Sequence, residues 1–348
     1  MDKQVNIREI AKAAGVSIAS VSRALQPTPS PYLSEKQRRK ILDVCARMHY
    51  CPNEHTRRML SKRANTVAIF FPPFADMNTD FLAHKLDDNF GECMLGAQSV
   101  LARNGIGLLL VEVNSEFLKN QKYLKMSRGK VIDGIMIWGV LENEQYLREL
   151  VNEKVPMVLL QNEKENFPCS SVTADDYCGA ALVTERLIKA GHRRIAIAPP
   201  PLGASTGRHR YQGIIDTLHR HGIHDYFEVS ERGYGYNFGG WAAMEITAKA
   251  PDVTSVIMPN DLSAWGCIDA LKQLKIRIPD DISVVGGDGL WVPGEVQITS
   301  YKTPAYEVGR TGAELLLAQL EGDDEVKHCC LPIQPVEGNT IRELNAET

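Results

Sequence analysis

Near the start of the chain, five residues could form a small binding surface. This surface is mostly apolar and contains one arginine. Ile18, Ala19, Ser20, Ser22 and Arg23 recur on the outward side of a predicted helix. Methyl groups of this kind contact thymine in the DNA major groove, and an arginine can donate two parallel hydrogen bonds to guanine. The pattern therefore predicts a helix that lies in the major groove and reads base edges.

Two short helices joined by a tight turn would position this surface. Asn6 and Glu9 have the spacing of a capping box at the start of the first helix. Gly15 is suited to end that helix, and Ser17 is suited to cap the second. An ordinary helical hairpin with no role in DNA binding is the alternative. Apolar residues recur at helical spacing in both helices, at Ile7, Ile10, Ala11, Ala14, Val21, Ala24 and Leu25.

A third helix and a basic linker follow. Prolines at 27, 29 and 31 prevent the second helix from continuing. The spacing of Ser34 and Gln37 predicts a second capping box. The segment 53–63 then carries four basic residues and few apolar ones, so a helix there would be marginal alone in water. The third helix is expected to bury one apolar face, composed of Ile41, Leu42, Cys45 and Met48.

Charge is distributed unevenly along the 348 residues. Residues 1–63 contain 13 Lys and Arg against 5 Asp and Glu, a net charge of +8, whereas the remainder carries −12. A basic head on an acidic body predicts that the head binds a polyanion.

No apolar run reaches membrane-spanning length, no signal peptide is recognisable and the eight cysteines lack metal-ligand spacing. We therefore expect a cytoplasmic protein with reduced thiols and no membrane association.

From Thr66 onward, short apolar runs alternate with amphipathic segments. Continuous strand-like runs between helices predict parallel sheets covered on both faces. The strands are too many for one sheet, so two α/β lobes are expected, with ligands at the carboxyl ends of the strands. The predicted strands are 67–71, 107–113, 134–138, 157–160, 194–198, 255–258 and 283–286. The predicted helices lie near 90–104, 144–154, 176–190, 209–222, 238–250, 263–275 and 304–321.

The sequence shows no recognisable catalytic constellation. A Walker-type loop, a GxSxG elbow and an HExxH motif are all missing, and the adjacent Asp175 and Asp176 would seldom face one site. We therefore expect no enzyme activity and no cofactor. A sugar-binding protein without gene control and a sugar-modifying enzyme fused to a head remain alternatives. A steep loss of DNA affinity with salt would separate a DNA-binding regulator from both.

Several motifs resemble those of one protein family. The head contains AGVSIASVSRAL, LSEK and YCPN, and the body contains VIDGIMIW, LVTERLIKAGHRRIAI, GRHRYQGI, NDLSAWGCIDAL and IPDDISVVGGDG. Together they resemble the lactose-repressor (LacI/GalR) family of bacterial regulators over nearly the whole chain. The resemblance implies an all-α helix-turn-helix head and a hinge helix. These would be followed by an α/β, two-lobed core like that of periplasmic sugar-binding proteins, with parallel sheets.

The resemblance also implies domain boundaries. The chain would cross between the lobes three times, near 175, 302 and 332. The implied segments are a DNA-binding head at 1–52, a hinge at 53–64 and a core at 65–348, with an amino lobe of about 65–174 and 303–331 and a carboxyl lobe of about 175–302 and 332–348.

What the resemblance implies about function is an effector-controlled regulator, in most cases a repressor. Two heads of a homodimer would read a pseudo-palindromic, double-stranded operator. Hinge helices would enter the minor groove, where Met59 replaces the usual leucine wedge. The carboxyl-terminal IRELNAET has no heptad repeat, which favours a dimer over a tetramer. The candidate DNA-contacting residues are Ile7, Ser17, Ile18, Ala19, Ser20, Ser22, Arg23, Asn53, Arg57 and Met59.

The implied small-molecule effector is a sugar held between the lobes. Arg210 would donate hydrogen bonds to its oxygens, with a surface arginine as the alternative. Asp288 would accept from two hydroxyls, unless it caps a turn. Asn260 would offer an amide, while Asp261 would cap the next helix.

Three weaker effector contacts come from the amino lobe. Trp138 would stack on the sugar, although a place in the core is an equal alternative. Phe74 and Gln161 follow predicted strands and complete the set. Two departures from the family are Gly287 and Gly235, which replace usual aromatic residues, although Tyr234 and Tyr236 flank the second. Trp291 is expected to compensate for one of them.

Overall fold

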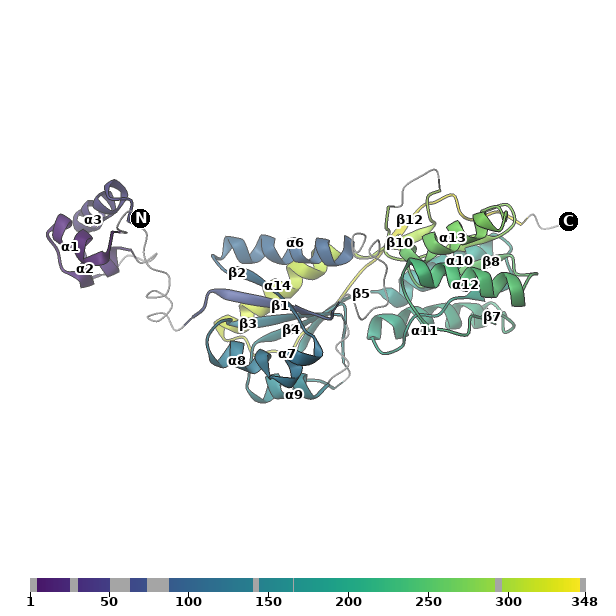
Figure 1. The fold of residues 1–348 in the computed structure, drawn as a ribbon, viewed down its shortest axis with the longest axis horizontal. Coiled ribbons are helices and arrows are strands. Elements are labelled where there is room, and N and C mark those ends of the chain that lie inside the picture. The colour runs from purple at the N-terminus through teal and green to yellow at the C-terminus, as the bar shows by residue number, and fades with distance from the viewer. Residues whose placement is uncertain are drawn as a thin grey trace. The chain divides into compact units, whose positions relative to one another are not determined.

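The computed structural model describes residues 5–25, 31–50, 63–73, 88–139, 144–164, 166–291 and 296–344. The chain forms two compact units, Met1–Ala64 and Asn65–Thr348, which we call the head and the body. Figure 1 shows the elements of each unit.

The head contains the predicted helix-turn-helix. The helices are α1 (Ile7–Ala14), α2 (Ile18–Ala24) and α3 (Glu35–Arg47). The capping box of Asn6 and Glu9 is confirmed, as is the left-handed Gly15 (φ 66°) at the end of α1. Ser17 caps α2 by accepting from the backbone N–H of Ser20 at 3.1 Å. These local interactions fix the angle between α1 and α2.

Two details of α3 correct the sequence analysis. Ser34 caps the helix, but the side chain of Gln37 accepts from the Ser34 hydroxyl at 3.3 Å instead of from its backbone, so the reciprocal half of the box is absent. Leu42 is 38% exposed, and Val44 is buried in its place. The helical face is therefore rotated slightly from the predicted one, because Val44 packs with Ile41 and Cys45 around α1 and α2.

In the body, the amino lobe is a six-stranded parallel sheet with helices on both faces (Figure 1). Alternate side chains of strand β1, which lies between β3 and β2, enter two separate cores: Val67 and Ile69 on one face, Ala68 and Phe70 on the other. The strands in spatial order are β11 (His328–Leu331), β5 (Ser170–Ala174), β4 (Met157–Leu160), β3 (Gly134–Trp138), β1 (Thr66–Phe71) and β2 (Gly107–Glu112). The helices are α6 (Asp88–Arg103) and α14 (Ala305–Glu321) on one face, and α7 (Ser115–Lys119), α8 (Lys122–Arg128) and α9 (Glu144–Asn152) on the other.

The carboxyl lobe repeats this layering around a four-stranded parallel sheet. An antiparallel pair, β10 (Ser300–Lys302) and β12 (Gln334–Val336), adjoins it through a bridge between Asp288 and Lys302. The sheet order is β7 (Phe227–Glu228), β6 (Ile195–Ile197), β8 (Ser255–Ile257) and β9 (Ser283–Val285). The helices are α10 (Asp176–Lys189) and α11 (Ser205–Arg220) over one core, and α12 (Tyr236–Lys249) and α13 (Asp261–Gln273) over the other.

The chain passes between the lobes at three places. These are the step from β5 to α10, the step from β10 to α14 and the step from β11 to β12. All seven predicted strands and all seven predicted helices of the body are present. The sequence analysis missed five strands and two helices, most of which are short or lie at the crossings. The missed elements are β5, β7, β10, β11, β12, α7 and α8.

Helices α6 and α14 approach each other through glycines. A Cβ atom on Gly309 of α14 would lie 1.9 Å from the carbonyl oxygen of Cys93 on α6. A Cβ atom on Gly96 of α6 would lie 1.9 Å from the carbonyl oxygen of Tyr306 on α14. Any side chain at either position would therefore force the two helices apart.

We expect Gly309→Ala to destabilise the body, because the added methyl group must displace the backbone of α6. The expected loss is about 1–3 kcal/mol of unfolding free energy, as for other overpacked cores. Chemical denaturation measures it. Gly91→Ala on α6 is the matched control, since its Cβ would meet no atom within 4 Å and replacing a helical glycine gains about 0.5–1 kcal/mol. Equal effects of the two changes would contradict the packing argument.

Candidate functional site

The exposed side of α2 presents the residues predicted to contact DNA bases. Ile18 is 46% exposed, and Ala19 and Arg23 are also exposed. Val21 and Ala24, on the opposite side, are fully buried and hold the helix against the head core. A single exposed apolar side chain is common on protein surfaces, so the evidence for a binding face is that Ile18 shares this side of α2 with Ala19 and Arg23. The side of α2 that faces solvent is therefore suited to a groove of complementary shape.

The remaining DNA candidates differ in their surroundings. The hydroxyl of Ser17 is engaged in the cap and lies 3.0 Å from that of Ser20. Ser22 is half-buried. Ile7 is half-buried and packs against the head core. The candidates Asn53, Arg57 and Met59 lie outside the described residues, together with the rest of the predicted hinge helix up to residue 62.

One basic residue of the head has a structural role that sequence analysis did not separate from its neighbours. Arg38 of α3 donates through Nε to the carbonyl oxygen of Ala24 at 3.4 Å. A cation at the carboxyl end of a helix satisfies a carbonyl group that has no partner within the helix. Arg39, Lys40 and Arg47 are exposed on the same helix. Arg38 therefore fastens α3 to the end of the helix that carries Arg23.

In the body, Arg210 of α11 is the centre of a buried polar site. Its Nε donates to Asp176 at 2.8 Å, its Nη1 to the carbonyl oxygen of Pro259 at 2.8 Å and its Nη2 to Asp288 at 2.5 Å. The three acceptors stand at the start of α10, after β8 and after β9. Arg210 therefore joins segments that meet at the carboxyl ends of the parallel strands, where ligands bind in open α/β sheets.

Burial and charge together set the ionisation of this site. Burial alone lowers the pKa of Arg210, but the carboxylates of Asp288 and Asp176 and the ring of Tyr301 outweigh it and keep that pKa well above its usual value. Burial raises the pKa of Asp176, although Arg210 opposes the shift. The guanidinium has five N–H groups, and three are used here. Among the described residues no acceptor faces the other two N–H groups, and the Asp288 side chain retains 18% exposure.

The guanidinium of Arg210 lies over the ring of Tyr301 in a cation–π contact, with Cζ 5.6 Å from the ring centroid. It lies between two glycines, because Cβ atoms on Gly179 and Gly287 would lie 2.4 Å and 2.8 Å from ring atoms. Tyr301 therefore fills the space that a side chain at position 287 would need. Trp291, which we expected to compensate, is 74% exposed. Sequence analysis missed Tyr301 and also Asp176, which it had dismissed as one of two adjacent acids.

The structure corrects the helix-capping role expected for Asp261, because its neighbour Asn260 is the residue that caps α13. Asn260 caps α13, accepting from the N–H of Ser263 at 3.0 Å and from its hydroxyl at 2.6 Å. Asp261 is fully buried and instead accepts from the N–H of Leu290 at 2.7 Å and the hydroxyl of Ser300 at 2.9 Å. Burial raises its pKa well above the usual value. Asp261 thus positions the loop that carries Asp288, while the side-chain N–H₂ of Asn260 donates to none of the described residues.

Gln161 connects the lobes. Its side-chain oxygen accepts from the N–H of Ala174 at 3.1 Å, and its carbonyl oxygen accepts from the hydroxyl of Thr206 on α11 at 2.8 Å. The next residue, Asn162, accepts from the hydroxyl of Ser205 at 3.1 Å. These contacts join the loop after β4 to the start of the helix that carries Arg210.

The two aromatic candidates of the amino lobe are not brought to Arg210 by any described contact. Trp138 is half-buried, and its ring lies 5.7 Å from that of Phe90 within the core, which agrees with the core alternative. Phe74 lies outside the described residues. The described part of the chain contains no His, Cys, Asp or Glu cluster suited to a metal ion. No helix within it is long and apolar enough to cross a bilayer.

The fold and these sites define a protein with a helix-turn-helix head and a two-lobed α/β body. Comparison with known families agrees with both parts. Residues 6–53 match the model for bacterial regulatory proteins of the lacI family, and residues 184–341 match that of a periplasmic binding protein-like domain. The chain belongs to the lacI family of transcriptional regulators, which bind DNA and are not enzymes.

Curated relatives and solved structures extend this similarity to almost the whole chain. The ribose operon repressor of Bacillus subtilis (strain 168) is 28% identical over 89% of this chain and 90% of its own length. Catabolite control protein A of Priestia megaterium is 26% identical over 90% and 91%. The lac repressor dimer bound to operator and the anti-inducer ONPF superposes with a TM-score of 0.81 at 22% identity, over 98% of this chain and 100% of that one. The transcriptional regulator CelR in complex with cellobiose gives 0.71 at 25% identity, over 97% and 100%.

We expect Arg210→Met to destabilise the body by about 3–5 kcal/mol, because it leaves the buried Asp176 and the partly buried Asp288 without their cation. The loss should shrink as the pH falls from 7 towards about 4. In the variant, Asp176 keeps the upward pKa shift that its burial causes and loses the opposing effect of Arg210, so protonation of this carboxylate favours the folded state. Denaturant unfolding at several pH values measures this.

Arg220→Met is the matched control for this change. Arg220 lies on the same helix, is 56% exposed and pairs with Glu185 at 3.5 Å. Loss of such a surface ion pair costs about 0–1 kcal/mol. If the two variants lost the same stability, with the same pH dependence, Arg210 would not be the cation that compensates the buried charge of Asp176.

Proposed function

We propose that this protein binds a pseudo-palindromic operator as a homodimer and acts as a repressor in the cytoplasm. One observation supports the DNA-reading part most directly: Ile18, Ala19 and Arg23 form an exposed side of α2 over a fully buried core. In this proposal α2 lies in the major groove, where Arg23 bonds guanine and the apolar side chains contact thymine methyl groups. Several relatives bear the name repressor, and the lac repressor was solved as a dimer on its operator.

We further propose that the effector is an uncharged sugar held between the lobes by Arg210, Asp288 and Asn260. Two carboxylates surround one guanidinium in a buried site, so the described charges sum to an excess of negative charge. Such a site repels phosphates and carboxylates, whereas hydroxyl groups can donate to Asp288 and accept from the remaining N–H groups of Arg210. CelR was solved with cellobiose, and a LacI family regulator from Enterococcus faecium was solved with ribose.

Control of DNA binding would follow from a change in the arrangement of the lobes. The contact between Gln161 and Thr206 lies beside Arg210, so a ligand there would bind the two lobe arrangements unequally. Only such a difference in affinity can transmit a signal, and couplings of about 1–3 kcal/mol are typical. In this proposal the signal reaches the heads through the segment 53–64.

We expect Arg23→Ala to weaken operator binding by about 1–3 kcal/mol per half-site and to relax preference at one base position. The cause is the loss of a two-bond contact to guanine. Fluorescence anisotropy on an operator selected in vitro measures it, with a scrambled duplex of equal length as the control. Affinity for the scrambled duplex should fall much less and should itself drop steeply with salt. If the variant keeps both its affinity and its base preference, Arg23 does not read bases.

We expect a neutral sugar to raise the melting temperature of the protein and its charged analogue to fail. A ligand at a hundred times its dissociation constant adds about 2.7 kcal/mol. The panel should contain matched pairs, such as ribose with ribose 5-phosphate and glucose with glucuronate. Asp288→Asn should abolish the shift, whereas Asp281→Asn, an exposed change in the same lobe, should not.

Two results would contradict the ligand proposal in different ways. A larger shift with the anionic member of a pair would show that the charge argument is wrong. A flat response to every sugar would remove those sugars as effectors and leave the DNA-binding proposal intact.

A further inference from the structure

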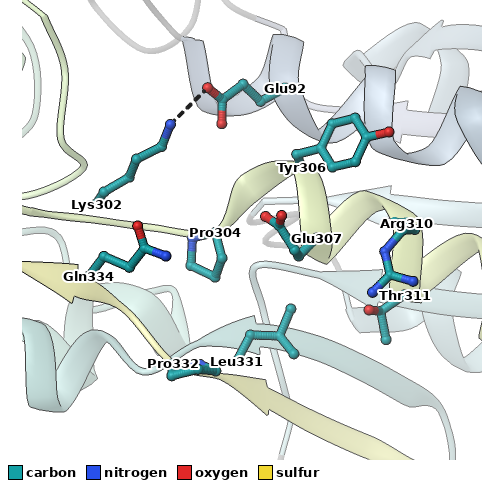
Figure 2. Close-up of a pocket in the computed structure, with 10 residues that line it drawn as sticks. All are labelled: Glu92, Lys302, Pro304, Tyr306, Glu307, Arg310, Thr311, Leu331, Pro332 and Gln334. Atoms are coloured by element: carbon teal, nitrogen blue, oxygen red, sulfur yellow. Dashed lines mark hydrogen bonds and ion pairs between the residues drawn. The ribbon is translucent and has the colours of Figure 1, made fainter.

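A second polar pocket lies in the body where two of the three chain crossings pass (Figure 2). Its volume of about 540 Å³ is within the range of small-molecule sites. Lys302 and Pro304 line it from the crossing between β10 and α14, and Leu331 and Pro332 line it from the crossing after β11. The first turns of α14, Glu92 of α6 and Gln334 of β12 complete the wall.

This pocket is separate from the Arg210 site. None of the residues proposed to bind the effector lines it. Strand β10 separates the two, because neighbouring residues on a strand point to opposite faces. Tyr301 of this strand lies beneath Arg210, and the next residue, Lys302, lines the pocket. A molecule in the pocket would therefore contact the same strand from the other side.

The charged residues that line the pocket differ in whether they form an ion pair. Lys302 forms an ion pair with Glu92 at 3.2 Å, drawn as a dashed line in Figure 2. Arg310 turns to Glu314 at 2.9 Å, on its own helix. Within the described chain, Glu307 alone among the charged lining residues forms no ion pair or side-chain hydrogen bond. Both cations of the lining are neutralised by a partner, and one carboxylate is left over.

The uncharged lining residues restrict what could neutralise that carboxylate. Pro304, Leu331 and Pro332 offer apolar surface beside Glu307 in Figure 2. Thr311 and Gln334 provide uncharged hydrogen-bonding groups at either side of it. A hydrated metal ion would make no contact with the apolar wall. A short hydrocarbon chain with an ammonium group could contact the carboxylate, the apolar wall and the uncharged hydrogen-bonding groups.

We propose that this pocket binds a small aliphatic amine. Its ammonium group donates to the carboxylate of Glu307, and its methylene groups lie along Pro304, Leu331 and Pro332. A terminal hydroxyl group, where present, bonds to Thr311 or Gln334. Because two crossings form the wall, the bound amine contacts the segments that must move when the lobes change their arrangement.

The first experiment compares three probes of the same length on the full chain without DNA. These are 4-aminobutan-1-ol, neutral butane-1,4-diol and anionic 4-hydroxybutanoate. Ligand-observed NMR titration measures each affinity. A charge-assisted hydrogen bond contributes about 1.5–3 kcal/mol, so the amine should bind at least about tenfold more tightly than the diol. Equal binding of the amine and the diol, or no binding of the amine, would overturn the proposal.

The second experiment locates the bound amine with variants. Glu307→Gln should weaken amine binding at least about tenfold and leave the melting temperature unchanged, because this side chain is exposed. Glu321→Gln, at the far end of the same helix, is the matched control and should bind the amine normally. If Asp288→Asn removes binding and Glu307→Gln does not, the amine occupies the Arg210 site and the proposal is wrong.

Discussion

The buried guanidinium of Arg210 connects three segments of the carboxyl lobe: the start of α10 and the segments that follow β8 and β9. Arg210 is bonded at once to Asp176, to Asp288 and to the carbonyl oxygen of Pro259. Taking these charges out of water is costly, and only good geometry with further hydrogen bonds offsets the cost. The cluster is therefore better understood as a device that fixes the geometry of the strand ends than as a large net source of stability. It holds Asp288 in place before any ligand arrives.

The elements that the sequence predicted well are those whose signals are local. Asn6, Gly15 and Ser17 sit within three residues of the groups they cap, and the central strands are continuous apolar runs. The missed strands depend on distant partners. Ser300 pairs with Val336, and His328 pairs with Ser171. Runs as short and mixed as HCCL or QPV have no periodicity of their own, so only the tertiary fold makes them strands.

The candidate site divides in the same way. Arg210 and Asp288 could be selected by resemblance to a family, but their mutual bond could not, because 78 residues separate them. Asp175 and Asp176 show the limit most clearly. Asp175 caps α10 through the N–H of Cys178, whereas Asp176 turns inward to Arg210. Adjacent identical residues receive opposite roles because a helix start directs one side chain along its axis and the next into the core.

Strand β10 separates the two polar sites with only three residues, Ser300, Tyr301 and Lys302. Because side chains alternate with a period of two, the insertion or deletion of one residue before Ser300 would exchange the two sides. An ammonium group would then face the buried guanidinium, and an aromatic ring would face the open pocket. Homologous proteins can thus change the chemistry on either side of β10 by substitution. The length of the segment that leads into β10 should stay the same in them.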